Sequence, residues 1–180
     1  MLFLSLSRDR LYISNFQFDT LKFWRHYETV IHIYTDGGCS GNPGPGGWAY
    51  VIMGNEKTTS SALFAEKWGG EASTTNNRME LQAVISALEC LPHIQPPEKN
   101  ATVYTDSQYV QKGMTLWLKD WKARGWKTSS KKPVKNQDLW QCLDALAAKF
   151  TITWVWVKGH AGNEYNERCD FLVQKAIASF

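Results

Sequence analysis

Four carboxylates stand at positions from which a folded chain could bring them together. Asp36 and Asp106 each end a short apolar run and share the local pattern Tyr-Thr-Asp. Glu80 and Asp170 each lie beside an apolar stripe of helical spacing rather than opposite it. Neighbouring carboxylates raise each other's pKa, and divalent cations relieve that repulsion. Because oxygen ligands suit Mg²⁺ or Mn²⁺, the four residues predict a metal-dependent reaction.

Two of the four acids also have an ordinary structural interpretation. Glu80 could be a helix-start acid favoured by the helix dipole, and Asp106 could cap the helix that follows it. An acid as near an apolar stripe as Asp170 is costly unless it is paired or binds a metal. Two acids in register at the ends of two strands favour a site over unrelated caps. Two metal ions about 3.5–4 Å apart would support in-line attack on a phosphodiester.

His160 lies between glycines in Lys158-Gly159-His160-Ala161-Gly162, just beyond an apolar strand. A lone histidine is more often structural or incidental than catalytic. Flanking glycines beyond a strand instead indicate a mobile loop that can bring the ring to a site.

A basic stretch that carries tryptophans runs over residues 117–132. Its basic and aromatic members are Lys119, Lys122, Arg124, Lys127, Lys131 and Lys132, interleaved with Trp117, Trp121 and Trp126. The pattern fits a solvated helix face whose tryptophans turn inward, and it also fits a protrusion that follows a phosphate backbone. Alongside four carboxylates, the second interpretation favours a nucleic acid as substrate.

The hydrophobic pattern predicts the elements that position these residues. Residues 31–36, 47–53 and 58–64 resemble the strands of an antiparallel meander, with loops at 37–47, 54–57 and 67–72. The pattern then predicts a helix from Thr75 or Asn76 to Pro92, a strand at 101–105, a helix from 136, a strand at 151–157 and a helix at about 164–179. A right-handed βαβ connection would place Asp36 and Asp106 at the same end of adjacent parallel strands.

Composition indicates one domain of ordinary size. The chain has 180 residues, 43% of them hydrophobic, and a net charge of +3, which is enough apolar material for one core. Its four widely spaced cysteines predict neither a zinc site nor a disulfide framework. No apolar run approaches the roughly 18 residues of a membrane span, and the apolar N-terminus is too short for a secretory signal. We therefore expect a cytoplasmic monomer.

Residues 1–29 follow no single hydrophobic period. We interpret them as an N-terminal extension of unknown role, disordered or not normally translated. Extra packing on the domain and a small binding element are the alternatives. The catalytic domain is expected to comprise residues 30–180.

Taken together, the motifs resemble bacterial ribonuclease H, type 1, over about residues 30–178. The stretches that carry the resemblance are Tyr34-Thr35-Asp36-Gly37, Asn42-Pro43-Gly44-Pro45-Gly46-Gly47-Trp48, Thr75-Asn76-Asn77-Arg78-Met79-Glu80, Thr105-Asp106-Ser107-Gln108-Tyr109-Val110, Val157-Lys158-Gly159-His160-Ala161-Gly162 and Asn166-Glu167-Arg168-Cys169-Asp170. The resemblance implies a mixed five-stranded α/β sheet, three antiparallel strands then two parallel, with helices on both faces. It also implies hydrolysis of the RNA strand of RNA–DNA hybrids with two Mg²⁺ ions, for which Mn²⁺ can substitute. The products would carry 5′-phosphate and 3′-hydroxyl ends, and the cellular targets would be RNA primers and R-loop RNA.

The same resemblance implies roles for the catalytic residues. Asp36 would bridge both metal ions, and Asp170 would help to hold the ion that activates the attacking water. Glu80 and Asp106 would hold the ion on the leaving-group side. His160 would assist water positioning or product release.

The resemblance also implies where the hybrid binds. Asn42, Asn76 and Gln108 would contact the minor groove, and Thr75 and Asn136 a DNA phosphate. The protrusion at 117–132 would lie along the DNA backbone through Trp117, Lys119, Trp121, Lys122, Arg124 and Lys127. Ser73 departs from the basic residue that several members carry there, which affects the phosphate pocket but not the chemistry.

Three other functions fit parts of the pattern less well. A non-catalytic hybrid-binding module predicts loss of a metal carboxylate, yet all four are present. The basic protrusion and the Gly-His-Ala-Gly loop disfavour a nuclease of the same superfold with another substrate. A nucleotide-phosphate loop at 41–47 would lack the Lys-Ser/Thr of a P-loop, and its prolines remove backbone donors.

Overall fold

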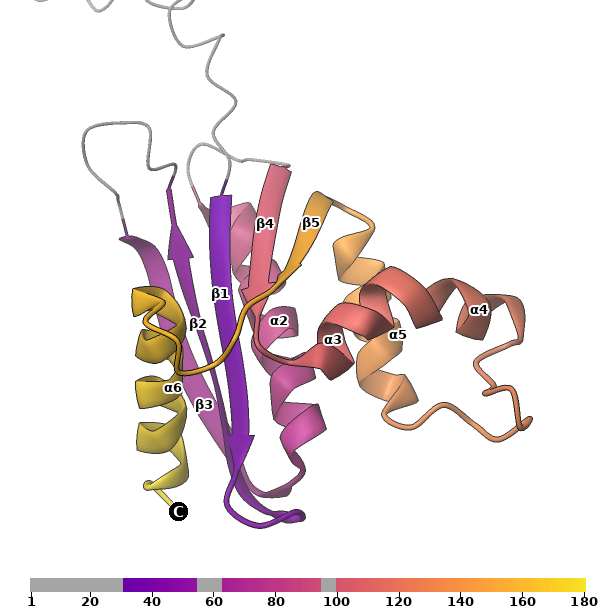
Figure 1. The fold of residues 1–180 in the computed structure, drawn as a ribbon, viewed down its shortest axis with the longest axis horizontal. Coiled ribbons are helices and arrows are strands. Elements are labelled where there is room, and N and C mark those ends of the chain that lie inside the picture. The colour runs from indigo at the N-terminus through magenta and orange to yellow at the C-terminus, as the bar shows by residue number, and fades with distance from the viewer. Residues whose placement is uncertain (1–30, 55–62, 95–99) are drawn as a thin grey trace, which may run out of the picture.

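The computed structural model describes residues 31–54, 63–94 and 100–180. The proposed extension at 1–29 and the predicted turn and strand start within 55–62 lie outside these residues. Within the described part, five strands form one mixed sheet in the order β3-β2-β1-β4-β5 (Figure 1). The strands are β1 (Ile31–Cys39), β2 (Gly44–Met53), β3 (Leu63–Thr74), β4 (Asn100–Thr105) and β5 (Thr151–Trp156). The first three are antiparallel neighbours, whereas β4 and β5 run parallel to β1, which confirms the predicted fold class.

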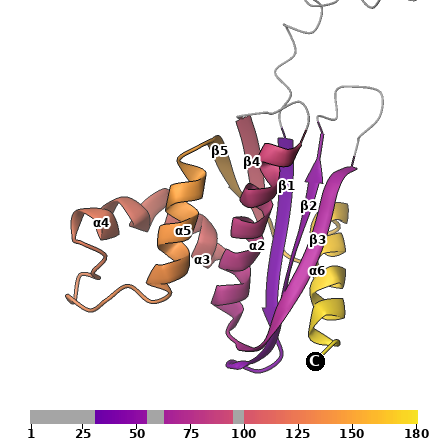
Figure 2. The same cartoon turned by 180° about the vertical axis from the view of Figure 1, so that it is seen from behind.

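Helices cover both faces of the sheet, as Figure 2 shows from behind. The helical elements are α2 (Asn76–Cys90), η2 (Leu91–His93), α3 (Gln108–Lys112), η3 (Gly113–Trp117), α4 (Leu118–Ala123), α5 (Gln137–Ala147) and α6 (Glu164–Ile177). The larger core lies on the α2 side and includes Ile33, Leu88, Val103, Trp140 and Leu143. The smaller core joins α6 to β1 and β2 and includes Val51, Cys169 and Leu172. Among the described helices, none combines the length and apolar character needed to cross a membrane.

The parallel pairing of β1 and β4 puts their two acids in register, as predicted. Thr35 of β1 pairs with Thr105 of β4, so Asp36 and Asp106 each follow a paired threonine. Asp36 does not end its strand, however, because β1 continues to Cys39. The two carboxylates therefore lie beside the end of β4, at a point where β1 continues toward Cys39.

Two predicted loops prove to be largely strand. The glycine-rich residues 37–47 were expected to turn throughout, but β1 ends at Cys39 and β2 begins at Gly44, so the turn is confined to 40–43. Gly37 stays in the strand because α2 packs so closely on it that a Cβ there would lie 2.2 Å from the backbone nitrogen of Glu80. Residues 67–72, predicted as a loop, belong to β3, which pairs with β2 along this stretch. Their polar side chains are accommodated because β3 is an edge strand and mostly exposed.

Candidate active site

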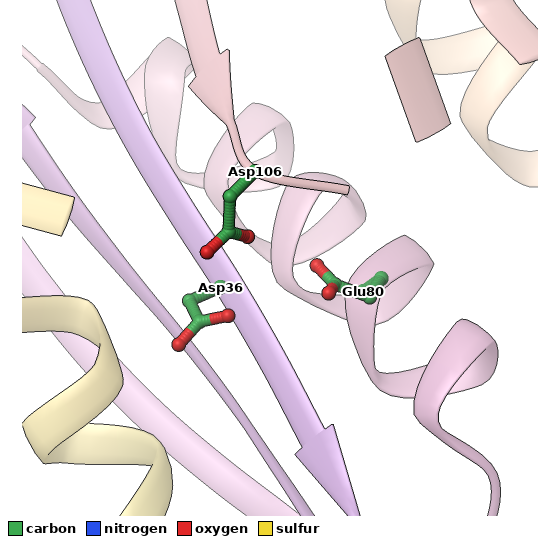
Figure 3. A group of neighbouring side chains, drawn as sticks. All are labelled: Asp36, Glu80 and Asp106. Carbon is green, nitrogen blue, oxygen red and sulfur yellow. The ribbon is translucent and has the colours of Figure 1, made fainter. Parts of the chain in front are cut away.

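Three carboxylates from distant parts of the chain converge at the end of β4. Asp36 comes from β1, Glu80 from the first turns of α2 and Asp106 from the residue after β4. One oxygen of each can be chosen so that all three lie within 4.8 Å of one another. Figure 3 shows these side chains directed toward a common space. This is the arrangement that the sequence predicted for Asp36, Glu80 and Asp106.

Burial and mutual repulsion make the metal-free cluster electrostatically costly. Asp36 is only 8% exposed and Glu80 only 5%. Burial, followed by the charges of Asp106 and Asp170, raises the pKa of Asp36 from 3.8 to about 7, although the Gly37 N–H donates to its Oδ1 at 2.8 Å. Burial and then the charge of Asp36 also raise the pKa of Glu80 well above its usual value.

The donor set fits a divalent cation. Within the described residues, Oε2 of Glu80 is buried and has no hydrogen-bond partner. A buried carboxylate oxygen without a partner is costly, and a cation close to three carboxylates would offset both that cost and the repulsion. An all-oxygen ligand set favours Mg²⁺ or Mn²⁺ over zinc.

Asp170, the fourth predicted carboxylate, lies beside this cluster rather than within it. It projects from α6 and is not among the three acids that approach within 4.8 Å, yet its charge contributes to the raised pKa of Asp36. Its Oδ2 is 3.8 Å from Nδ1 of His160, and its Oδ1 accepts a hydrogen bond from Nε2 of Gln174 at 3.4 Å. The structure thus places Asp170 and His160 together, with the histidine ring 79% exposed.

A shallow polar depression joins these groups to the start of α2. It has a volume of about 380 Å³, and its lining includes Asp36, Asp170, Ser40, Asn76 and Gln174. Such an open, polar depression beside the acids suits a large polar ligand rather than an enclosed apolar one.

The residues predicted to bind the hybrid lie on the rims of several elements. Thr75 caps α2, and its buried hydroxyl lacks a partner among the described residues. Asn42 is exposed in the β1–β2 turn, and Asn76 is the exposed first residue of α2. Gln108 begins α3 and accepts from Nζ of Lys112 at 2.8 Å. Asn136 caps α5 with a φ of 58°, and its amide donates to the Tyr109 hydroxyl at 3.3 Å.

The structure confirms that the tryptophans of the basic stretch at 117–132 face inward, whereas its contact with a phosphate backbone stays a prediction. Trp117 and Trp121 are half-buried against each other, with ring centroids 5.7 Å apart, and Trp121 also packs edge-on against Trp140. The tryptophans therefore anchor the segment. The basic side chains lie outside, on a part of the chain that extends away from the sheet (Figure 1).

The charges of this protrusion are not equally available. Lys122 pairs with Asp144 at 2.7 Å, and Arg124 pairs with Asp120 at 3.2 Å. Lys119 and Lys127 are exposed, and neither forms an ion pair within the described part of the chain. Like the exposed Lys131 and Lys132, they carry charges that no carboxylate pairs with among the described residues.

Sequence reasoning assigned no role to three residues that contact Asp106. Asn166 donates from Nδ2 to Oδ2 of Asp106 at 3.4 Å, and Trp156 donates from Nε1 to the Asp106 carbonyl at 2.9 Å. Gly159 approaches so closely that a Cβ there would lie 2.7 Å from Oδ2 of Asp106. Asn166 precedes Asp170 by one helical turn, so both lie on the same face of α6. This spacing could have indicated that Asn166 lies near the site.

Comparisons with known proteins agree with this geometry. The RNase H family profile matches residues 28–178. The chain is 55% identical over 147 residues to Ribonuclease H of Aromatoleum aromaticum, covering 82% of this chain and 90% of that protein. It is also 55% identical to Ribonuclease H of Cupriavidus metallidurans, covering 83% of this chain and 96% of that protein.

Two solved structures extend the similarity to the fold. LC9-RNase H1, a type 1 RNase H with the type 2 active-site motif, superposes with a TM-score of 0.74 at 33% identity, covering 85% of this chain and 74% of that one. LC11-RNase H1 in complex with an RNA/DNA hybrid gives 0.63 at 28% identity, covering 83% and 97% respectively. With its sheet order, its carboxylate cluster and these relatives, the chain belongs to the RNase H family and is a type 1 ribonuclease H of the bacterial kind.

Proposed function

We propose that this chain hydrolyses the RNA strand of RNA–DNA hybrids with the help of two divalent ions, Mg²⁺ in the first instance. The observation that carries the proposal is the convergence of Asp36, Glu80 and Asp106 in a chain of the RNase H family. The hybrid complex of LC11-RNase H1, a protein of the same fold, supports the substrate. We also propose that residues 30–180 form the catalytic domain, which the family match over 28–178 supports.

The four carboxylates would hold the metal ions, with Asp36 shared between them. When bound, the ions would supply an activated water and would stabilise the charge that develops on the phosphodiester. Asp36 must be ionised to serve as a ligand, and a nearby cation lowers the pKa that burial has raised. Attack on phosphorus with departure of the 3′-oxygen leaves the 5′-phosphate and 3′-hydroxyl ends that we expect.

His160 and Asp170 form the outer part of the site. The His160 side chain is exposed, and its Nδ1 lies 3.8 Å from Oδ2 of Asp170, so the ring stands at the open side of the site. We propose that it positions the attacking water or assists departure of the product from this open side.

Hybrid binding is assigned to the rim residues and the protrusion. The unpartnered hydroxyl of Thr75 is suited to a DNA phosphate, together with the amide of Asn136. Asn42, Asn76 and Gln108 would read the minor groove, where the 2′-hydroxyls distinguish RNA from DNA.

A direct test offers the same labelled RNA strand as an RNA–DNA hybrid, as duplex RNA and as a single strand. We expect cleavage of the hybrid alone, in Mg²⁺ and not in EDTA, with 5′-phosphate ends on the fragments. Equal cleavage of all three substrates, or cleavage that persists in EDTA, would overturn the proposal. A folded chain that binds the hybrid but never cuts it would support a binding module instead.

Removing the basic charges of the protrusion should weaken hybrid binding mainly at low salt. Lys119, Lys122, Arg124 and Lys127 replaced together by Ala should raise KM and leave kcat nearly unchanged. Each lost phosphate contact should reduce the slope of log binding constant against log salt by roughly 0.9. Steady-state kinetics at several salt concentrations measure this change.

Two double variants separate free from paired charges. The Lys119→Ala/Lys127→Ala pair should flatten the salt dependence more than Lys122→Ala/Arg124→Ala, because Asp144 and Asp120 already pair with the latter two. Lys175→Ala, on α6, is a control that removes one positive charge outside the protrusion. A salt slope equal to that of the parent in all variants would exclude the protrusion as a binding surface.

A further inference from the structure

We propose that Asn166 is a positioning residue that holds the Asp106 carboxylate in the orientation required for metal binding. The inference rests on the proposed function, because it takes Asp106 to be a metal ligand. It assigns to α6 a second contribution to the site besides Asp170. Three features of the structure support it.

The first feature is the way in which the Asn166 side chain is used. Asn166 is only 2% exposed, and its backbone N–H, not its amide, donates to Oδ1 of Asn163 at the start of α6. The amide Nδ2 donates to Oδ2 of Asp106 at 3.4 Å, whereas Oδ1 is buried and has no partner among the described residues. The bond to Asp106 is thus the hydrogen bond that this buried amide makes within the described residues, and a buried amide that made none would be costly. Its contact with Asp106 therefore indicates why an asparagine stands here.

The second feature is the confinement of Asp106. Its carbonyl accepts from Nε1 of Trp156 at 2.9 Å, which ties the backbone after β4 to β5. Gly159 borders the carboxylate so closely that any Cβ would lie 2.7 Å from Oδ2. In the described part of the chain, Asn166 is the only hydrogen-bond donor to this carboxylate. The amide of Asn166 therefore limits the remaining rotation of the Asp106 side chain.

The third feature is the chemistry of an amide donor. An amide orients a carboxylate without neutralising it, so Asp106 keeps its charge for a cation. The opposite amide orientation would bring Oδ1 of Asn166 against a carboxylate oxygen, which the hydrogen-bond network disfavours. Outer groups that orient metal ligands typically contribute 10- to 100-fold to metal affinity or activity.

The test measures Mn²⁺ binding to the full chain by the loss of the free-ion signal in electron paramagnetic resonance. We expect Asn166→Ala to weaken Mn²⁺ binding by about 10-fold and to shift the metal dependence of cleavage to higher concentration, with the KM for hybrid unchanged. Asn166→Leu, which fills the volume but has no donor, should lose as much. Asn166→Leu also keeps Mn²⁺ binding measurable if the Ala variant does not fold.

Leu172→Ala is the matched control, because Leu172 is equally buried on α6 but belongs to the apolar core. It should lower the melting temperature and leave Mn²⁺ affinity unchanged. If Asn166→Leu binds Mn²⁺ as the parent does, the positioning role is wrong even though the proposed function stands. If the parent itself binds no Mn²⁺ and cuts no hybrid, the proposed function fails and this inference fails with it.

Discussion

Asp36→Asn is expected to abolish hybrid cleavage and, in EDTA at pH 8, to make the protein more stable than the parent. Loss of an outer-sphere metal partner already costs 10- to 100-fold, so loss of the residue shared by both ions should cost more than about 100-fold in kcat. The gain in stability has a separate cause, because Asn removes a buried charge that the hydrogen bond from the Gly37 N–H offsets only in part. The two effects together distinguish a metal ligand from a structural acid.

The sign of the stability change follows from the pKa of Asp36. Folding raises that pKa from 3.8 to about 7 in the metal-free protein, chiefly through burial. Between these values the folded state binds more protons than the unfolded state, so stability falls as pH rises from about 4 and the loss is complete above about 7. A shift of this size lowers the free energy of unfolding by roughly 4 kcal/mol. The Asn variant avoids this loss, and its advantage should shrink toward pH 4.

Thermal melts in EDTA from pH 4 to 8, with cleavage assays in Mg²⁺, measure both effects. At pH 8 the variant should melt roughly 8–16 °C above the parent. Asp138→Asn is a matched control, since Asp138 pairs with Arg78 at 3.0 Å on the surface and the guanidinium lowers its pKa. That change should destabilise slightly and leave cleavage intact. Parent-like cleavage by Asp36→Asn would contradict its role as ligand, and a lower melting temperature at pH 8 would contradict the repulsion.

The convergence of Asp36, Glu80 and Asp106 could be predicted because their positions follow from local patterns and from the pairing of two strands. The two Tyr-Thr-Asp strands were predicted to be parallel neighbours, and the register of Thr35 with Thr105 confirms this, although β2 and β3 as well as α2 lie between them in the chain. Glu80 followed from the capped start of α2 at Thr75. The same local reasoning left Asp170 and His160 as separate signals, and only the fold places them 3.8 Å apart.

The predictions of loops at 37–47 and 67–72 were wrong because tertiary contacts, which composition does not reveal, decide whether a strand forms there. Glycine usually interrupts a strand, but Gly37 remains in β1 because another backbone occupies the place of a side chain. Residues 67–72 are polar and glycine-rich, and their strand exists through pairing with β2, which is distant in sequence. Asn166 was a motif residue without a role, since nothing local indicates that its amide meets Asp106.

Gly37→Ala is expected to damage the fold and the active site through one contact. A Cβ at residue 37 would lie 2.2 Å from the backbone nitrogen of Glu80 and 2.3 Å from the carbonyl carbon of Met79. Backbone atoms cannot rotate away as a side chain can, so β1 and α2 must separate. Overpacking of a core typically costs 1–3 kcal/mol, and a clash with backbone on this scale should cost roughly 3 kcal/mol or more. Urea unfolding in EDTA measures this loss.

The neighbouring Gly38→Ala is the control, since its Cβ would meet side-chain atoms, Cγ1 of Val173 at 2.9 Å and Cδ1 of Ile177 at 3.6 Å, and a side chain can yield. It should cost less stability than Gly37→Ala. Beyond stability, Gly37→Ala should weaken Mn²⁺ binding even where the variant is fully folded, because residue 37 follows one ligand and contacts the backbone of another. A folded Gly37→Ala that bound Mn²⁺ as tightly as the parent would mean that the spacing of Asp36 and Glu80 does not determine metal affinity. We expect the opposite, since Gly37 directly follows Asp36 and lies against the backbone of Glu80, and these two residues carry two of the three converging carboxylates.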